Sequence, residues 1–330
     1  MTASARPPAI AVTGLRKSYG DQVVLDGIDL TVAEGTIFAL LGPNGAGKTT
    51  TVNILSTLIP ADGGQVRVAG HDLATDPAGI RAAIGVTGQF SAIDAMLTGE
   101  ENLLLMASLN HLGKLDGRRR AHDLLERFDL ADAGKKIAAT YSGGMRRRLD
   151  LAMTLVGDPR MIFLDEPTTG LDPRSRRTMW QIIRDLATSG VTLLLTTQYL
   201  DEADELAGRI AVLDRGRLVA EGTADELKRR IPGGHIELRF RDLPGLAGAA
   251  KSLGEASRDA VSFEETVSLD EGALILRVPA DGTPQSVKAV LDRLGQHVMD
   301  ADSITVHTTD LDDVFFALTG GPRRDQEIPA

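Results

Sequence analysis

A glycine-rich loop in the first fifth of the chain carries the residue types that bind phosphate. Glycine lets consecutive backbone N–H groups close around phosphate oxygens, a lysine adds a positive charge, and a hydroxyl residue can bind Mg²⁺. We therefore expect Lys48 to reach the β- and γ-phosphates of a nucleotide and Thr49 to bind the metal. The predicted nucleotide-binding set comprises Gly42, Pro43, Asn44, Gly45, Ala46, Gly47, Lys48, Thr49 and Thr50.

Two flanking segments give this loop the setting that phosphate binding requires. The apolar run 36–41 before it predicts a buried strand, and residues 50–58 after it have the apolar pattern of a helix. The N-terminus of that helix would point its dipole at the phosphates. A strand, a glycine-rich loop and a helix in this order favour a nucleotide site over a chance turn.

A second apolar run, 161–164, ends in the carboxylates Asp165 and Glu166. In phosphoryl transfer one carboxylate can hold a magnesium ion, directly or through water, while another polarises an attacking water. We assign the first role to Asp165 and the second to Glu166. Many strands end in acidic turns, so this segment is informative only together with the phosphate-binding loop. The two motifs predict ATP and Mg²⁺ as ligands and hydrolysis as the reaction.

The elements that must position these motifs alternate along the chain. From residue 10 to 227, short apolar runs alternate with longer amphipathic segments, which is typical of an α/β domain with a largely parallel sheet. The expected buried strands are 36–41, 161–164 and 191–196. Residues 23–32 alternate apolar and polar positions instead, so we expect them to form an antiparallel edge.

A second, smaller domain is expected after the break at Pro232, Gly233 and Gly234. The expected order is a strand at 236–240, a helix at 245–253, weak and strong strands at 260–263 and 273–278, a helix at 284–294 and a strand at 298–306. This order is compatible with a βαββαβ domain, followed by a last helix at 311–318. The predicted organisation is a flexible N-terminus at 1–9, the α/β domain at 10–230, an α+β domain at 231–319 and a disordered tail at 320–330.

Composition narrows the possible partners of the chain. Its 330 residues include 36 Lys and Arg against 46 Asp and Glu, a net charge of −10, which argues against general nucleic-acid binding. Cysteine is absent, which removes disulfides and zinc–thiolate sites. The apolar runs are far shorter than the roughly 20 residues that span a bilayer, and the first residues lack the core of a signal peptide. Membrane association would therefore need a partner.

Three further motifs give the chain a family resemblance. Ser142, Gly143 and Gly144 precede the acidic strand, Gln89 lies between the two phosphate motifs, and 170–172 reads Gly-Leu-Asp. From about Val12 to Leu227 the chain closely resembles the ATP-binding cassette of ABC transporters, although Tyr141 and Met145 replace the commonest neighbours of the Ser-Gly-Gly signature. The resemblance implies a P-loop NTPase fold with a mixed-sheet core, an antiparallel β subdomain and a helical subdomain.

Within that family the chain looks most like the daunorubicin-resistance-type drug export ATPases. The resemblance rests on the stretches 86–90, 140–151 and 196–203 and on a tail motif at 311–320, and so it extends over nearly the whole chain. Because the chain holds one cassette, it implies a homodimer in which each ATP lies between the loop of one copy and the signature of the other. The signature set is Ser142, Gly143, Gly144 and Met145.

The resemblance also implies roles for three single residues. Asp172 would lie at the dimer interface, and Gln89 would join Thr49 and Asp165 as a metal ligand, in a loop that also contacts the membrane partner. Tyr19 could stack its ring on adenine, the alternative being a packing tyrosine before a strand. The apolar residues after Gln89 either pack inward or receive a cytoplasmic helix of the partner: Phe90, Ile93, Met96 and Leu97.

Gln198 departs from the family pattern, which usually places histidine after the strand 191–196. Glutamine can donate and accept hydrogen bonds to a γ-phosphate or an attacking water, but it cannot ionise. We expect slow but real hydrolysis, with Glu166 as base, Gln198 as a second catalytic residue and little dependence on a titrating group near neutral pH.

Two arginine clusters and the histidines are weaker signals. No aromatic residues are interleaved with 118–120 or 146–148, so solvated helix faces or partner contacts are favoured over a nucleic-acid stripe. The six histidines are scattered without the spacing of metal ligands, and we expect them to have surface or packing roles.

The leading functional expectation is the motor subunit of an export pump. ATP would close the dimer and hydrolysis would reopen it, moving separate integral membrane permease subunits that export a drug or a lipophilic metabolite. The chain would then be a peripheral protein on the cytoplasmic face of the cell membrane, with no nucleic-acid partner. The alternatives are a soluble ABC ATPase acting on DNA or ribosomes, and a nucleotide-binding switch without useful turnover.

Overall fold

The computed structural model describes residues 7–88, 92–230, 234–256, 268–270, 272–280, 282–308 and 310–319. The chain divides into two compact units, Met1–Ala224 and Asp225–Ala330. Several sequence predictions therefore fall outside the described residues, namely those for Gln89, Phe90, the weak strand 260–263, residues 1–6 of the N-terminus and the tail 320–330.

The first unit contains a six-stranded mixed sheet with the order β10-β9-β3-β8-β7-β6. Its strands are parallel except for β10, which pairs antiparallel with β9. The central strands β3, β7 and β8 are buried at every residue, which is why they read as continuous apolar runs. The strands are β3 (Ile37–Leu41), β6 (Ile84–Thr87), β7 (Met161–Asp165), β8 (Thr192–Thr197), β9 (Arg209–Asp214) and β10 (Arg217–Gly222).

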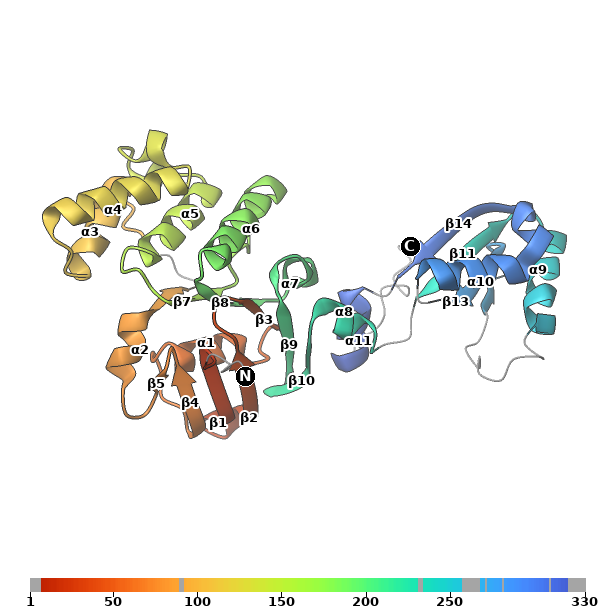
Figure 1. Ribbon diagram of the computed structural model, residues 1–330, viewed down its shortest axis with the longest axis horizontal. Coiled ribbons are helices and arrows are strands. Elements are labelled where there is room, and N and C mark those ends of the chain that lie inside the picture. The colour runs from red at the N-terminus through yellow and green to blue at the C-terminus, as the bar shows by residue number, and fades with distance from the viewer. Residues whose placement is uncertain are drawn as a thin grey trace, which may run out of the picture. The chain divides into compact units, whose positions relative to one another are not determined.

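A second, antiparallel sheet in this unit has the order β2-β1-β4-β5. Its strands are β1 (Ile10–Tyr19), β2 (Gln22–Val32), β4 (Gly63–Val68) and β5 (His71–Asp72). Strand β2 lies at its edge and pairs only with β1 among the described strands, so the alternation of apolar and polar residues predicted the antiparallel edge correctly. Helix α1 (Lys48–Leu55) lies between the two sheets (Figure 1).

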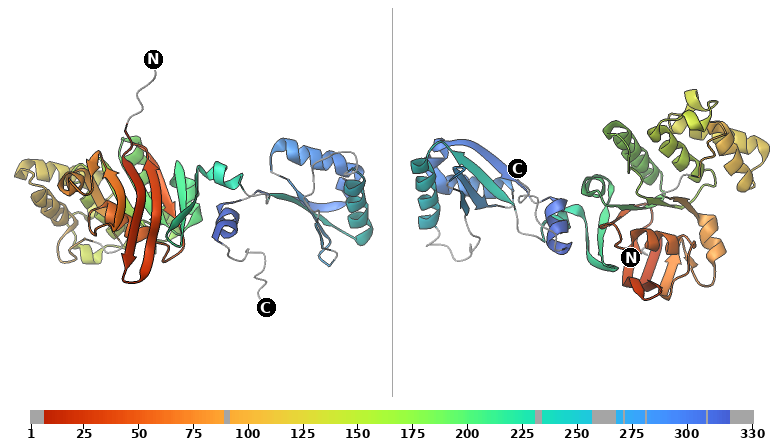
Figure 2. Two further views of the ribbon diagram at one scale, coloured as in Figure 1. Left: turned by 90° about the horizontal axis from the view of Figure 1, so that it is seen from below. Right: turned by 180° about the vertical axis from the view of Figure 1, so that it is seen from behind.

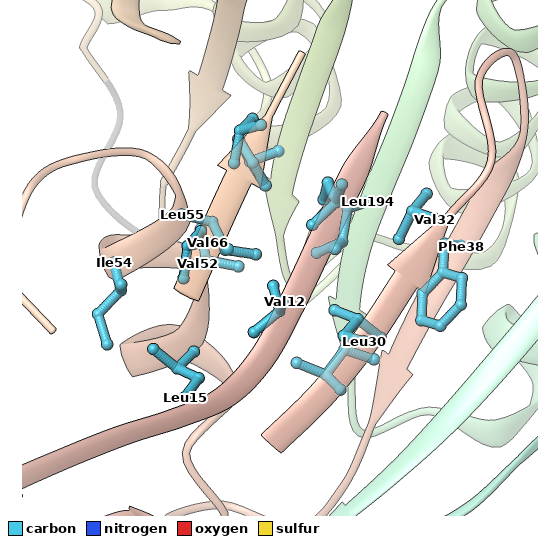
Figure 3. Close-up of a cluster of buried hydrophobic side chains, with 14 of the residues drawn as sticks. Val12, Leu15, Leu30, Val32, Phe38, Val52, Ile54, Leu55, Val66 and Leu194 are labelled. Carbon is cyan, nitrogen blue, oxygen red and sulfur yellow. The ribbon is translucent and has the colours of Figure 1, made fainter. Parts of the chain in front are cut away.

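The core of the first unit fills the space between these layers. Figure 3 shows β1 and β2 contributing Val12 and Leu30, α1 contributing Val52, and the mixed sheet contributing Phe38 and Leu194. All of these side chains are almost completely buried. The phosphate-binding loop is thus anchored at both ends, because both β3 and α1 belong to this core.

Helices form the remainder of the first unit. A group of three, α3 (Gly99–Leu109), α4 (Lys114–Arg127) and α5 (Gly143–Thr154), gathers apart from the antiparallel sheet, as the predicted helical subdomain requires (Figure 1). Helix α3 begins with a capping box in which Thr98 and Glu101 bind each other's backbone N–H. The other helices are α2 (Pro77–Ala83), α6 (Pro173–Thr188) and α7 (Leu200–Leu206), with short 3₁₀ turns at Ala131–Ala133 and Ala138–Thr140.

The second unit contains an antiparallel four-stranded sheet with the order β12-β13-β11-β14. Its apolar face packs against α9 and α10, with Leu238 and Leu276 in the core between them (Figures 1 and 2). The elements are α8 (Ala224–Lys228), β11 (His235–Phe240), α9 (Leu243–Ala256), β12 (Ser268–Asp270), β13 (Ile275–Pro279), α10 (Pro284–Leu294), a 3₁₀ helix (Gly295–Asp300), β14 (Ala301–His307) and α11 (Leu311–Thr319). Among the described residues the elements follow the predicted βαββαβ order with a short second strand at Ser268–Asp270, whereas the strand predicted at 260–263 lies outside them.

Among the described residues, no helix combines the length and the apolarity needed to cross a lipid bilayer.

Candidate functional site

The two predicted phosphate motifs and Gln198 meet at one edge of the mixed sheet. Strands β3, β7 and β8 are parallel neighbours, so their carboxyl ends lie together. In register, Leu41 at the end of β3 pairs with Thr197, and Asp165 at the end of β7 pairs with Thr196. The residues that follow these strands, Gly42, Glu166 and Gln198, therefore lie at the same edge of the sheet.

The phosphate-binding loop depends on glycine at two of its positions. Gly45 and Gly47 have φ angles of +82° and +109°, a region that strains residues with a side chain. A Cβ on Gly47 would also lie 2.6 Å from a side-chain carbon of Leu25. The chain then enters α1 at Lys48, with Gly47 as its N-cap and its carbonyl accepting from the Thr51 N–H. A helix directly after the loop is thus confirmed, although it begins at Lys48 and not at residue 50 as predicted.

Lys48 carries its charge within this loop. The side chain is 5% exposed, and its Nζ donates to the carbonyl oxygens of Gly42 (2.8 Å) and Pro43 (3.1 Å). It lies 4.0 Å from Oε1 of Glu166. Burial lowers the pKa of Lys48, whereas the carboxylates of Glu166 and Asp165 act in the opposite direction. The ammonium group is therefore close to both the loop and the acidic strand end.

Asp165 and Thr49 place oxygen ligands side by side. Asp165 is 3% exposed, and its Oδ2 accepts from Oγ1 of Thr49 at 3.0 Å. Thr196 donates its hydroxyl to the other carboxylate oxygen. Hard divalent cations such as Mg²⁺ prefer carboxylate and hydroxyl oxygens, so this pair fits a magnesium ion. The third predicted ligand, Gln89, lies outside the described residues.

Glu166 has an unusual backbone conformation. Its φ of +49° lies in the left-handed region, which is strained for a residue with a side chain. Its N–H donates to the backbone carbonyl and the hydroxyl of Thr196, both at 3.1 Å, and its Oε2 accepts from Thr169 Oγ1 at 3.2 Å. Strain of this kind is common at functional sites, and the Glu166 carboxylate here lies 4.0 Å from the Lys48 ammonium group.

The signature residues form the exposed start of α5. Ser142 caps this helix by accepting from the Met145 N–H at 3.2 Å, and both Ser142 and Gly143 are exposed. A Cβ on Gly144 would lie 2.6 Å from Oγ of Ser175, so glycine lets α5 approach the first turn of α6. Ser175 in turn donates to Asp172, the N-cap of α6. The structure thereby brings the signature and Asp172 together.

Asp172 is held by the first turn of the helix it caps. Its carboxylate accepts from the backbone N–H groups of Arg174 and Ser175 at 3.0 Å and from the Ser175 hydroxyl at 2.6 Å. These bonds, that from the Ser175 hydroxyl most of all, lower the pKa of Asp172. The carboxylate therefore stays ionised at neutral pH on an exposed turn.

Other predicted residues lie in different surroundings. Tyr19 ends β1 with half of its surface exposed, and the Nζ of Lys17 lies 5.5 Å from its ring centroid, so the ring is not a core residue. Gln198 is half-buried directly after β8. Met96 is 79% exposed, so its side chain does not pack inward.

The prediction that residues 146–148 form a solvated helix face or partner contacts is wrong for two of them. The side chains of Arg147 and Arg148 are each only 16% exposed. Arg148 donates to the carbonyl oxygen of Phe128 at 3.0 Å and to Asp129 Oδ2 at 2.8 Å. Arg147 donates to carbonyl oxygens at the end of β7. The signal in the sequence was Asp150, three residues after Arg147 on the same helix face and 3.6 Å from it.

Two of the six histidines, although distant in the sequence, meet in the second unit. His235 and His307 pair across β11 and β14 with stacked rings, 4.6 Å between centroids, and offer ligand atoms within 4.8 Å of Glu237. Glu237, however, binds Arg277 at 3.0 Å, and that guanidinium would repel a cation. We therefore assign this cluster no metal.

The mixed sheet, the phosphate-binding loop, the acidic strand end and the helical group together define a P-loop nucleotide-binding cassette. Comparison with known proteins agrees with this class. The sequence model of the ABC transporter family matches residues 25–169.

Relatives extend the match over nearly the whole chain. The daunorubicin resistance ATP-binding protein DrrA3 of Streptomyces coeruleorubidus is 48% identical over 97% of this chain and 98% of its own length. The daunorubicin/doxorubicin resistance ATP-binding protein DrrA of Streptomyces peucetius is 45% identical over 96% of this chain and 94% of its own length. The chain therefore belongs to the ATP-binding subunits of ABC transporters, in the daunorubicin-resistance group, and is an ATPase of that class.

Solved structures are similar to about two thirds of the chain. An ATP-binding subunit of an ABC transporter is 29% identical with a TM-score of 0.61, covering 67% of this chain and 92% of its own. A dimeric ATP-binding cassette in a post-hydrolysis state, bound to ADP and phosphate, is 25% identical with a TM-score of 0.60, covering 65% of this chain and 98% of its own. The predicted P-loop fold is thereby confirmed.

Proposed function

We propose that this chain energises an export pump for a drug or lipophilic metabolite by hydrolysing ATP beneath separate membrane subunits. The observation that carries the proposal is the meeting of Lys48, Thr49, Asp165 and Glu166 at one sheet edge, in a chain whose relatives are named for daunorubicin resistance. Those names favour the exporter over a soluble ATPase acting on DNA or ribosomes. The inferred location is the cytoplasmic face of the cell membrane, where the chain is held peripherally by its permease partner.

The residues at the sheet edge divide the work of hydrolysis. The loop N–H groups and Lys48 bind the β- and γ-phosphates, while Thr49, Asp165 and Gln89 hold Mg²⁺. When bound, the metal would neutralise charge on the phosphates. Glu166 accepts a proton from the attacking water, and Gln198 orients that water or the γ-phosphate through its amide.

A second copy of the chain completes each site in this proposal. The exposed start of α5 offers backbone N–H groups and a helix dipole to the nucleotide of the partner. Asp172, tied to that start through Ser175, lies at the same interface. Support comes from the similar cassette solved as a dimer. Tyr19, with its exposed ring, stacks on adenine.

The test is drug export by cells that produce the chain together with a candidate six-span permease. Cells with the parent chain should accumulate less daunorubicin than cells with the Glu166→Gln variant, because that variant keeps the fold and loses the base. Purified complex should also show ATPase that rises with the drug. Equal accumulation in both strains, with ATPase stimulated by DNA or ribosomes instead, would replace the exporter with the soluble alternative.

A further inference from the structure

The side chain of Arg147 leaves the second turn of α5 and ends among four backbone carbonyls. Its Nε donates to Pro167 at 2.8 Å, and its Nη2 donates to Asp165 at 3.0 Å and to Glu166 at 3.1 Å. Its Nη1 donates to Gly88 at 3.1 Å. One guanidinium therefore binds the carbonyl of the last residue of β7, those of the next two residues, and that of the residue directly after β6.

This arrangement uses the planar fork of arginine. A guanidinium offers five N–H donors in fixed directions, whereas lysine offers a compact charge on a flexible stem. The Arg147 side chain is 16% exposed, and its buried charge is balanced by Asp150, whose Oδ2 lies 3.6 Å away. Burial lowers the pKa of Arg147, against the raising effect of Asp150 and the other nearby carboxylates, yet arginine keeps its proton in proteins. The fork is thus a permanent donor set.

The segment that Arg147 binds contains the strained residue of the site. Glu166 adopts a φ of +49°, a conformation that persists only where its surroundings hold it. Thr196 fixes the N–H of Glu166 from one side, and Arg147 fixes its carbonyl from the other. The backbone on both sides of the Glu166 side chain is therefore set by hydrogen bonds.

We infer that Arg147 is a positioning residue for hydrolysis, which aims the Glu166 carboxylate and links it to the signature helix. The inference rests on the proposed function of Glu166 as the base. Arg147 lies two residues after Met145, so a shift of the start of α5 against a partner's nucleotide would move the fork and the backbone it holds. The bond to Gly88 extends the link to the residue before Gln89. Closure of the dimer and alignment of the base thereby become one event.

Steady-state ATPase of the Arg147→Lys variant tests this role. The charge remains but the fork is lost, so kcat should fall by about tenfold or more, because small misplacements of a catalytic group can cost about 100-fold. KM for ATP and the affinity for a fluorescent ATP analogue should change by less than about twofold, since Arg147 donates to backbone carbonyls at Gly88 and 165–167 and not to the loop 42–50 or to the Asp165 carboxylate. The matched control is Arg148→Lys, an equally buried arginine on the same helix that also binds carbonyls, with kcat expected within about twofold of the parent.

A double-mutant cycle with Glu166→Gln distinguishes positioning from a merely structural role. If Arg147 acts through Glu166, adding Arg147→Lys to Glu166→Gln should change the residual single-turnover rate by less than about twofold. An undiminished kcat in Arg147→Lys, or the same loss in both backgrounds, overturns the inference. A joint loss of ATP affinity and thermal stability also overturns it. Parental turnover in Glu166→Gln would refute the base assignment instead, so the two failures are separable.

Discussion

The carboxyl edge of the mixed sheet and the open face of the second unit's sheet use charge in opposite ways. At the first, Lys48, Asp165 and Arg147 are nearly buried, and the backbone is left-handed at Glu166. On the second, Glu237 and Arg277 form an ion pair that is partly exposed to water. Burying a charge costs free energy unless the charge is paired and hydrogen-bonded, so buried charges are often kept for function. The contrast supports the assignment of the chemistry to the carboxyl edge of the first unit's sheet.

The largest expected effect concerns Lys48. Lys48→Ala should reduce ATPase at least about 100-fold, because removing one positioned donor from a transferring charge typically has an effect of that size. The measurement is the initial rate of phosphate release, with the exposed Lys135→Ala as a matched control at the parental rate. A loss of similar size in Lys135→Ala would remove the contrast between buried and exposed charge.

The next effect concerns the stability of the second unit. Leu238 is fully buried in its core, so Leu238→Ala should lower the free energy of unfolding of that unit by about 2–5 kcal/mol. Chemical denaturation would measure this loss. Ile304, which is 40% exposed on the edge strand β14, provides the control, and Ile304→Ala should have a clearly smaller effect. Equal losses would mean that β14 has a covered face in solution.

A smaller, pH-dependent effect is expected from Glu202, a buried carboxyl in the first unit. Burial raises its pKa, although hydrogen bonds from Thr168, Thr197 and Trp180 lower it. The folded chain thus binds this proton more tightly than the unfolded chain, and the free energy of unfolding should fall as pH rises from about 4.5 through the raised pKa. Glu202→Gln keeps an acceptor without titrating.

The melting temperatures of parent and Glu202→Gln, compared from about pH 5 to about pH 8, check this sign. The variant should gain stability relative to the parent as pH increases. A constant difference between the two proteins would show that Glu202 does not change its proton affinity on folding.

The smallest effect belongs to the second unit's surface charge. Arg277→Gln should lower the free energy of unfolding by less than about 1 kcal/mol, because the ion pair with Glu237 is partly exposed and screened. Denaturation at low and high salt would measure the loss, which should shrink as salt increases. A salt-independent loss would instead indicate a pair covered from water.

Sequence alone predicted those elements of the candidate site that are encoded by short, continuous stretches of the chain. The loop, the acidic strand end and the strands that carry them follow from apolar runs and short motifs, since parallel strands place their carboxyl ends together. Helix α1 was expected to reach residue 58, but it ends at Leu55 because Thr57 turns to a φ of +66°. Because the residue that makes this turn is not a glycine, no signal in the sequence marked the end of the helix.

Arg147 shows what sequence could not predict. Its partners at Asp165 and Pro167 lie 18 to 20 positions away, across a loop whose path depends on the fold. Neighbouring arginines with the same side chain point elsewhere: Arg148 binds Phe128 and Arg146 binds Ala139. Helical periodicity separates their directions, but only the packed neighbours decide which direction is buried.

The left-handed backbone of Glu166 lowers the stability of the fold at a residue that we propose hydrolysis requires. Glycine would adopt this φ without strain, whereas for a residue with a side chain this conformation lowers the stability of the fold by about 1–2 kcal/mol. Variants selected for heat resistance alone should therefore drift towards glycine at this position and become inert as they become more robust. An engineered, more stable form of the chain would have to gain its stability elsewhere and leave this one disfavoured residue in place.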